Sequence, residues 1–151
     1  MSTPVLTIER MTHATLPTAS RLLSAQLAEH DIELGELAAQ RALAGLLDDS
    51  SRGFVLLART SETVGLAVCP FTWTVEHGGQ VAWLDELYIV PEHRGRGFGR
   101  GLLLQVVEEC RQAGCLAIDL EVDQEHMRAA GLYEREGFVA LPRKRYSRRL
   151  A

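Results

Sequence analysis

The stretch HRGRGFGRG, residues 93–101, limits the possible folds more than any other part of the sequence. It places four glycines at alternate positions, with three arginines among them, directly after the apolar run VAWLDELYIV at residues 81–90. Glycine has no Cβ, so its backbone adopts left-handed conformations and approaches other groups closely. Beyond it, apolar residues recur at helical spacing, and Gly114 is placed to end that helix. The sequence therefore predicts a strand, a glycine turn and a helix, in that order.

A glycine turn that leads into a helix is suited to binding phosphate groups. Its backbone N–H groups can surround an anion, and the helix N-terminus adds a partial positive charge. The Lys-Ser or Lys-Thr pair of a P-loop is absent, and no placement of the glycines fits GxGxxG, which argues against a dinucleotide site. A flexible turn with solvated arginines is the alternative that this pattern leaves open.

The whole chain, residues 1–151, is expected to form a single α/β domain with a mixed sheet. Strands are predicted at residues 5–10, 54–60, 63–73, 81–90 and 115–122, and helices at 14–29, 36–47, 102–113 and about 124–136. The three consecutive strands that end at residue 90 suggest an antiparallel meander. Residues 138–141 and 144–150 could close the sheet.

Composition argues against several classes of protein. A net charge of −4 disfavours a general nucleic-acid surface, which needs clustered lysine and arginine. The chain lacks both a long apolar segment and a basic, apolar leader at its start, so a cytoplasmic protein without a membrane span is expected. The three cysteines lack CxxC spacing and lie in apolar surroundings, so reduced thiols are expected rather than disulfides or a metal site.

Two motifs together resemble a known family. The first is Arg94-x-x-Gly97-x-Gly99, and the second is the A-x-x-L-Y-x-x-x-G-F pattern from Ala129 to Phe138. Both are similar to the signatures of the GNAT N-acetyltransferases, and the resemblance is densest over residues 81–138. One departure is His126, which stands where many members have asparagine.

The resemblance implies a GNAT fold, with a mostly antiparallel sheet of six to seven strands and about four helices. It also implies acetyl-CoA as co-substrate, with the pyrophosphate on backbone N–H groups of the glycine turn and the pantetheine arm along the preceding strand. The residues expected to contact acetyl-CoA are Leu87, Ile89, Val90, Arg94, Gly95, Arg96, Gly97, Phe98, Gly99 and Arg100. Members of the family commonly form homodimers, although the sequence specifies no interface.

Acetyl transfer to an amine requires a proton acceptor, because an alkylamine with a pKa of about 10 is protonated at neutral pH. Asp85 and Glu86 are adjacent carboxylates in an apolar strand, where strict alternation places them on opposite faces. A buried carboxylate is costly, so both are candidates for the base. The LDELY stretch resembles the acidic pair of diamine and polyamine acetyltransferases, which favours Asp85. Pairing of Glu86 with a neighbouring arginine is the structural alternative.

The resemblance assigns Tyr133 as the acid that protonates the departing thiolate of CoA. A tyrosine on an amphipathic helix is otherwise a core residue. The favoured function is acetylation of a primary amine on a small molecule by direct attack in a ternary complex. Acetylation of protein N-termini or lysines, and a non-enzymatic acyl-CoA sensor, are the alternatives.

Overall fold

The computed structural model describes residues 4–123 and 128–151 of the chain. The chain separates into two compact units, which meet in sequence after Leu120. The first unit contains the sheet and the helices α1 (Leu16–Glu29), α2 (Glu36–Asp48) and α3 (Phe98–Gln112). The second unit, Glu121–Ala151, contains α4 (Arg128–Arg135) and the C-terminal segment.

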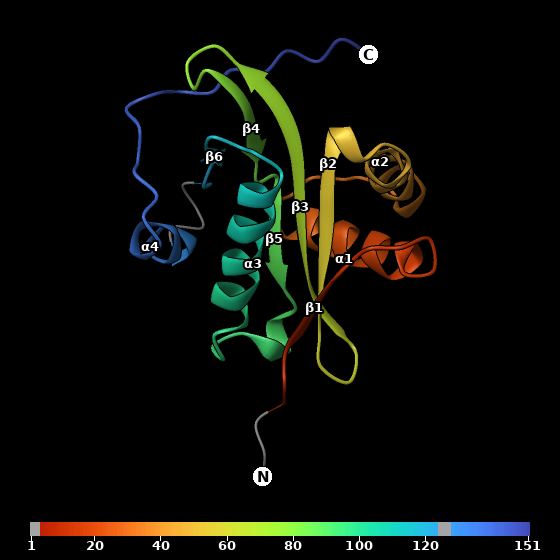
Figure 1. The fold of residues 1–151 in the computed structure, drawn as a ribbon. Helices are drawn as coiled ribbons and strands as arrows, with labels where there is room; N and C mark the ends of the chain where they lie inside the picture. The colour runs from red at the N-terminus through yellow and green to blue at the C-terminus, as the bar shows by residue number, and fades with distance from the viewer. Residues whose placement is uncertain (1–3, 124–127) are drawn as a thin grey trace. The chain divides into compact units, whose positions relative to one another are not determined.

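A sheet of six strands forms the centre of the first unit (Figure 1). Its strands are β1 (Thr7–Arg10), β2 (Gly53–Arg59), β3 (Thr63–Thr74), β4 (Gly79–Trp83), β5 (Glu86–Ile89) and β6 (Ile118–Asp119). They pair in the order β1-β2-β3-β4-β6, and β5 pairs with β3. All pairs are antiparallel except the parallel pair of β4 with β6. The predicted mixed, mostly antiparallel sheet is therefore confirmed.

The three helices of the first unit cover opposite faces of the sheet (Figure 1). Alternate residues of β3 point to opposite faces. On one face, Leu66 and Val68 join a buried cluster with Leu23 of α1 and Leu43 of α2. On the other face, Cys69 contacts α3. The core therefore lies in two layers, one on each side of β2 and β3.

A bulge interrupts the strand that was predicted over residues 81–90. Ala82 pairs with Phe71 and Glu86 pairs with Val68, so three residues of this segment lie opposite two residues of β3. One of those two is Pro70, which has no N–H to donate to the ladder. The predicted single strand is therefore two strands, β4 and β5, which pair with successive parts of β3.

The bulge also changes which side chains share a face. Val81, Glu86 and Tyr88 all pair with residues of β3 whose side chains point to the same face of the sheet. That side belongs to the cluster that α1 and α2 cover. The strict alternation predicted for residues 81–90 is therefore wrong, because it placed Val81 on the face opposite to Glu86 and Tyr88.

Two further predictions about the sheet need correction. The strand expected at residues 115–122 is reduced to β6, Ile118–Asp119. Neither 138–141 nor 144–150 is a strand. Their large apolar side chains are exposed, as with Val139 at 79% and Leu150 at 90%. The closely spaced cations of residues 143–149 leave this segment without a continuous apolar face to bury.

The second unit confirms the helix that was predicted before Gly137. Helix α4 ends at Arg135, and Gly137 follows with a φ of 92°. The predicted start of this helix near Gln124, as well as His126, lies outside the described residues. None of the helices in the described part of the chain is long and apolar enough to span a membrane.

Candidate active site

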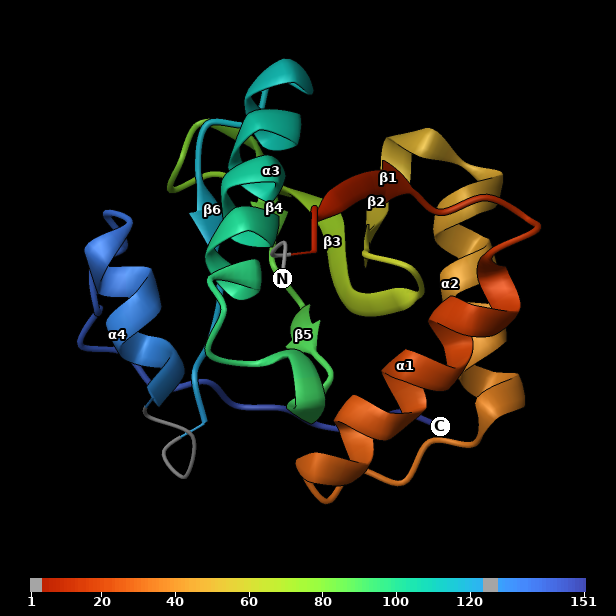
Figure 2. The same cartoon turned by 90° about the horizontal axis from the view of Figure 1, so that it is seen from below.

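The glycine turn joins β5 to α3 through a short 3-10 helix, η2 (Pro91–His93), as Figure 2 shows. Gly95 and Gly97 both have a φ of 79°, and Gly97 is the N-cap of α3. A Cβ added at either glycine would meet no described atom within 4 Å. The left-handed backbone therefore requires these glycines, and a larger side chain would project into the space in front of the turn.

The turn presents a series of backbone N–H groups. The amides of Gly95, Arg96, Gly97, Phe98 and Gly99 make no backbone hydrogen bond to another described residue. The first amides of a helix have no partner within it, and they carry the positive end of the helix dipole. The Phe98 side chain is buried and stacks on His93, which leaves its backbone amide as the group that can contribute to binding. Arg100 lies in the same first turn of α3.

Arg94 is held by protein groups. Its Nε donates to the carbonyl oxygen of Ile89 at 2.8 Å, and its Nη2 donates to the Glu29 carboxylate at 3.0 and 3.2 Å. Its guanidinium also lies over the ring of Tyr88, 5.4 Å from the ring centre. The side chain therefore ties the end of α1 to the end of β5, and the contact of Arg94 with acetyl-CoA stays a prediction.

Strand β5 has one free edge. Its other edge pairs with β3, and no further strand among residues 4–120 pairs with it. The N–H of Val90 donates to Val64 on the β3 side. Alternation therefore directs the amides of Leu87 and Ile89 to the free edge. Val90 is not part of this edge, because its N–H donates to Val64 and its carbonyl accepts a hydrogen bond from the N–H of His93.

The two candidate carboxylates lie in different environments. Asp85 is exposed, whereas Glu86 is half-buried. Burial, and then the nearby charge of Asp85, raise the pKa of Glu86 to about 7. No described lysine or arginine forms an ion pair with Glu86. The alternative, in which Glu86 pairs with a neighbouring arginine, therefore has no such arginine among the described residues. Glu86 can therefore take up or release a proton near neutral pH.

A polar group that the sequence did not predict lies next to this strand. Tyr88 is buried, and its burial and then the charge of Glu29 raise its pKa. Gln26, one turn before Glu29 on α1, is 5% exposed, and its Oε1 has no hydrogen-bond partner in the described structure. Nothing in the sequence around Gln26 indicated that this glutamine would be buried. Tyr88 and Glu86 lie on the face of the sheet that α1 covers.

Tyr133 lies in α4, in the second unit. Its side chain is half-buried, and its ring meets the ring of Phe138 edge to face at 5.6 Å. The carbonyl of Tyr133 accepts the N–H of Phe138 at 3.0 Å, which closes the end of the helix. The five-residue spacing of Tyr133 and Phe138 in the second motif is therefore explained locally, and the acid role of Tyr133 stays a prediction.

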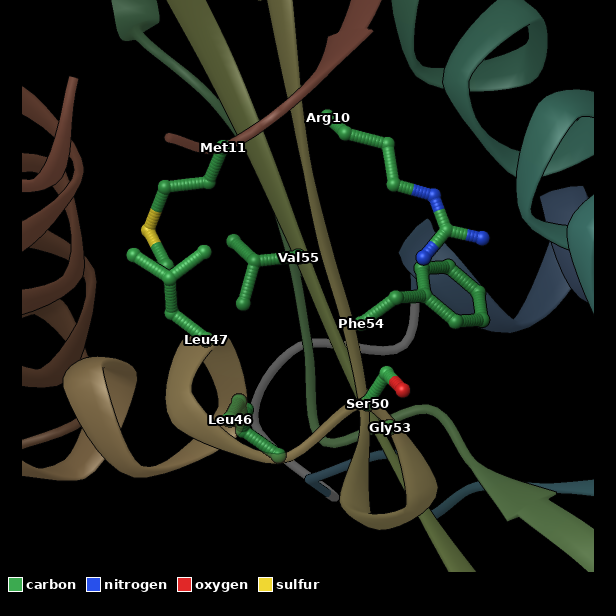
Figure 3. Close-up of a pocket in the computed structure, with 8 residues that line it drawn as sticks. All are labelled: Arg10, Met11, Leu46, Leu47, Ser50, Gly53, Phe54 and Val55. Carbon is green, nitrogen blue, oxygen red and sulfur yellow. The ribbon is translucent and has the colours of Figure 1, made fainter. Parts of the chain in front are cut away.

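A separate pocket of about 110 Å³ lies at the start of β2, where β1 leaves the sheet (Figure 3). Arg10 and Phe54 lie side by side in it, with the guanidinium 5.1 Å from the ring centre, and Leu46, Leu47 and Met11 line the other side. Arg10 also forms an ion pair with Glu109. One of its lining residues, Val55, pairs with Val68, which in turn pairs with Glu86 of β5. No group of potential ligands in the described residues could hold a metal ion.

Comparison with known proteins decides the family. A model of the acetyltransferase (GNAT) family matches residues 16–138. The chain belongs to the GNAT family. The resemblance predicted from the two motifs is confirmed, and so, at the level of the family, is the prediction of an acetyl-CoA-dependent acetyltransferase.

Relatives with assigned names support the same grouping. The chain is 30% identical over 106 residues to an aminoalkylphosphonate N-acetyltransferase of Salmonella typhimurium, a match that covers 70% of the chain and 69% of the relative. It is 37% identical over 93 residues to a mycothiol acetyltransferase of Thermobispora bispora, where the match covers 58% of the chain but 30% of the relative. The chain thus spans under a third of that relative's length.

A solved structure matches almost the whole chain. It is that of a putative acetyltransferase from Arthrobacter sp. FB24, with 32% identity and a TM-score of 0.82, and the match covers 99% of both chains. The predicted GNAT fold is therefore confirmed. The matched family region, residues 16–138, includes parts of both compact units.

Proposed function

We propose that the chain is an acetyl-CoA-dependent N-acetyltransferase that acts on a primary amine of a small molecule. One observation carries the proposal: a row of N–H groups without backbone partners, at residues 95–99, follows a strand with a free edge, and the same strand bears a half-buried carboxylate. Family membership supplies the reaction class, and these residues supply the chemical groups that it needs.

The residues of the glycine turn fit the diphosphate of acetyl-CoA. The amides of residues 95–99 and the N-terminus of α3 favour an anion, and no described side chain fills the space in front of Gly95 and Gly97. The amides of Leu87 and Ile89 at the free edge of β5 can hydrogen-bond to an extended amide-containing arm. Acetyl-CoA supplies the activated acetyl group as a thioester.

Glu86 is the proposed base. With a pKa of about 7 it is largely ionised at slightly alkaline pH, yet basic enough to accept a proton from an ammonium group, directly or through water. Asp85 remains the alternative base that the resemblance favoured. Its exposure leaves it solvated, and its charge raises the pKa of Glu86.

Tyr133 is the proposed acid for the leaving thiolate. A phenol with a pKa of about 10 can donate a proton to a thiolate. The support for this role is the match of residues 129–138 to the family motif.

A small-molecule amine is the proposed acceptor. The names of the relatives refer to small molecules, an aminoalkylphosphonate in one case and mycothiol in the other. Acidic residues lie around the end of α1 and the start of α2, and of these Glu29 pairs with Arg94. Asp31, Glu33 and Glu36 are exposed and remain candidates for attracting a cation. The homodimer and the cytoplasmic location stay predictions.

Free-thiol release in the presence of acetyl-CoA and a panel of acceptors tests the proposal. The panel contains polyamines, aminoalkylphosphonates, amino acid derivatives and aminoglycosides, together with peptides that carry a free N-terminus or a lysine. Release with a small amine, and none with peptides, is expected. Release with peptides alone would favour the protein acetyltransferase. Binding of acetyl-CoA without release for any acceptor would favour the sensor.

A further inference from the structure

Three cysteines lie together at the C-terminal end of α3, and one of them, Cys69, comes from a distant part of the sequence. The Sγ atoms of Cys69 and Cys110 are 3.9 Å apart, and both side chains are buried. Cys115 follows the helix and is half-buried, and Nε2 of Gln80 donates to its Sγ at 3.7 Å. All three are free thiols in the structure. The proposed acetyl transfer uses none of them.

The end of the helix brings Cys110 and Cys115 together. The N–H of Cys115 donates to the carbonyl of Cys110 at 2.9 Å, and the N–H of Gly114 donates to the carbonyl of Arg111 at 3.0 Å. Gly114 has a φ of 79°. This pair of hydrogen bonds is the Schellman motif, in which the side chains at the two ends of the longer bond commonly touch. In this chain those two side chains are the thiols of Cys110 and Cys115.

Cys110 and Cys115 both line a surface pocket. It has a volume of about 190 Å³ and is lined by Val107, Cys110, Arg111, Cys115, Leu116, Ala117 and Ile118. Cys69 does not line it and is fully buried. An oxidant as small as hydrogen peroxide can therefore reach the Cys110 and Cys115 pair before it reaches Cys69.

The two lining thiols differ in acidity. A hydrogen bond from the Cys69 thiol is the main cause that lowers the pKa of Cys110. Burial is the main cause that raises the pKa of Cys115. Because the thiolate is the nucleophile in sulfur chemistry, Cys110 is the better attacking group of the pair.

We propose that Cys110 and Cys115 form an oxidisable pair that closes to an intramolecular disulfide when the protein meets a hydroperoxide. The peroxide oxidises the Cys115 thiol, which is the more exposed of the two, to a sulfenic acid and is itself reduced, which for hydrogen peroxide releases one water. The Cys110 sulfur then attacks the sulfenic sulfur: the S–S bond forms, the S–O bond breaks, and the hydroxyl group leaves with the Cys110 proton as a second water. A thiol reductant reverses the modification.

Trypsin separates the three cysteines, which makes the bond directly measurable. Cleavage after arginine places Cys69 in residues 60–94, Cys110 in residues 101–111 and Cys115 in residues 112–128. The reduced protein is treated with hydrogen peroxide, its remaining thiols are alkylated under denaturing conditions, and the digest is analysed by mass spectrometry. The expected product joins 101–111 to 112–128, disappears on reduction, and leaves Cys69 alkylated.

Two variants sharpen the test. Cys115→Ser is expected to abolish the cross-link, whereas Cys69→Ala is expected to keep it, and circular dichroism checks that each variant folds. If Cys69→Ala does not fold, the digest of the wild-type protein still shows which cysteines are cross-linked. A cross-link between 60–94 and 101–111 as the main product, disulfides only between two molecules, or irreversible oxidation of Cys115 without a cross-link would each overturn the proposal.

Discussion

Glu86 and Asp85 are neighbours in the chain, yet the bulge between β4 and β5 gives them different surroundings. Glu86 turns to the face that α1 covers, and burial raises its pKa to about 7, while Asp85 stays exposed. The proposed base is therefore the carboxylate whose proton affinity suits neutral pH. This difference leads to two predictions for Glu86.

The first prediction concerns activity. Glu86→Gln removes the proton acceptor, so turnover is expected to fall by roughly 10²-fold or more in steady-state kinetics at saturating acetyl-CoA. Asp85→Asn is the matched control. It is expected to retain activity and to shift the acidic limb of the kcat/KM profile to lower pH, because the charge of Asp85 raises the pKa of Glu86. A larger loss in Asp85→Asn than in Glu86→Gln would make Asp85 the base.

The second prediction concerns stability. The pKa of Glu86 is raised by folding, so below about pH 4.5 its carboxyl is protonated in both the folded and the unfolded state. As the pH rises towards 7, the unfolded chain loses this proton first, and the free energy of unfolding falls. Since glutamine does not ionise, Glu86→Gln is expected to gain about 1–2 kcal/mol relative to wild type between about pH 5 and pH 8, after allowance for partial exposure.

Urea denaturation of both proteins at the two pH values measures this change. Asp85→Asn is expected to gain less than Glu86→Gln between these pH values, because it removes only the part of the raised Glu86 pKa that comes from the charge of Asp85. If wild type and Glu86→Gln keep the same difference in unfolding free energy at both pH values, the raised pKa of Glu86 is wrong.

Tyr133 carries the third prediction. Tyr133→Phe removes one hydroxyl and keeps the ring that contacts Phe138, so the helix end is preserved. Turnover is expected to fall by about 10²-fold while acetyl-CoA affinity, measured by calorimetry, stays within about twofold of wild type. Unchanged turnover would remove the acid role.

At the scale of elements, the turn before α3 and the free edge of β5 define the candidate site. The turn depends on Gly97, whose φ of 79° is unfavourable for a β-branched residue. Gly97→Val is expected to weaken acetyl-CoA binding by about tenfold or more, because it strains the turn and places a side chain in front of the amides.

Gly114→Val is the matched control for Gly97→Val. Gly114 has the same φ of 79° and, like Gly97, no described atom within 4 Å of an added Cβ, but it lies at the other end of α3. Both variants are expected to lower the Tm, whereas acetyl-CoA affinity is expected to fall in Gly97→Val alone. If calorimetry gives the two variants equal affinities for acetyl-CoA, the turn does not take part in acetyl-CoA binding.

These elements also show what the sequence could predict. The glycine turn, the helix after it and the strand before it were visible from local spacing. The bulge was not, because it depends on Pro70 in a strand eleven or more residues away in the chain. The partner of Arg94 was equally hidden, since Glu29 lies 65 residues earlier. Local pattern therefore predicted the turn and the strand of the candidate site, and long-range pairing decided which of their groups make other contacts.

At the scale of the whole molecule, the sequence predicted the fold class and the family. It also suggested two C-terminal strands that the structure does not form. The segments at 138–141 and 144–150 form no strand: the first is an apolar run of four residues, and the second has Tyr146 and Leu150 among four cations. The identity of the acceptor amine was the least predictable part. The polar residues in and near β5, such as Tyr88 and Gln26, belong to elements whose sequence is typical of an apolar core.

The measurement that tests the central claim most directly is a titration of isotope-labelled protein with CoA, followed by amide NMR. Binding of the diphosphate at the turn is expected to move the amide signals of Gly95, Gly97 and Gly99 most strongly, together with those of Leu87 and Ile89 at the free edge. The amides of Gly35 and Gly78, in exposed turns elsewhere, are expected to stay unchanged. Saturable CoA binding that leaves the Gly95, Gly97 and Gly99 signals in place would contradict the account.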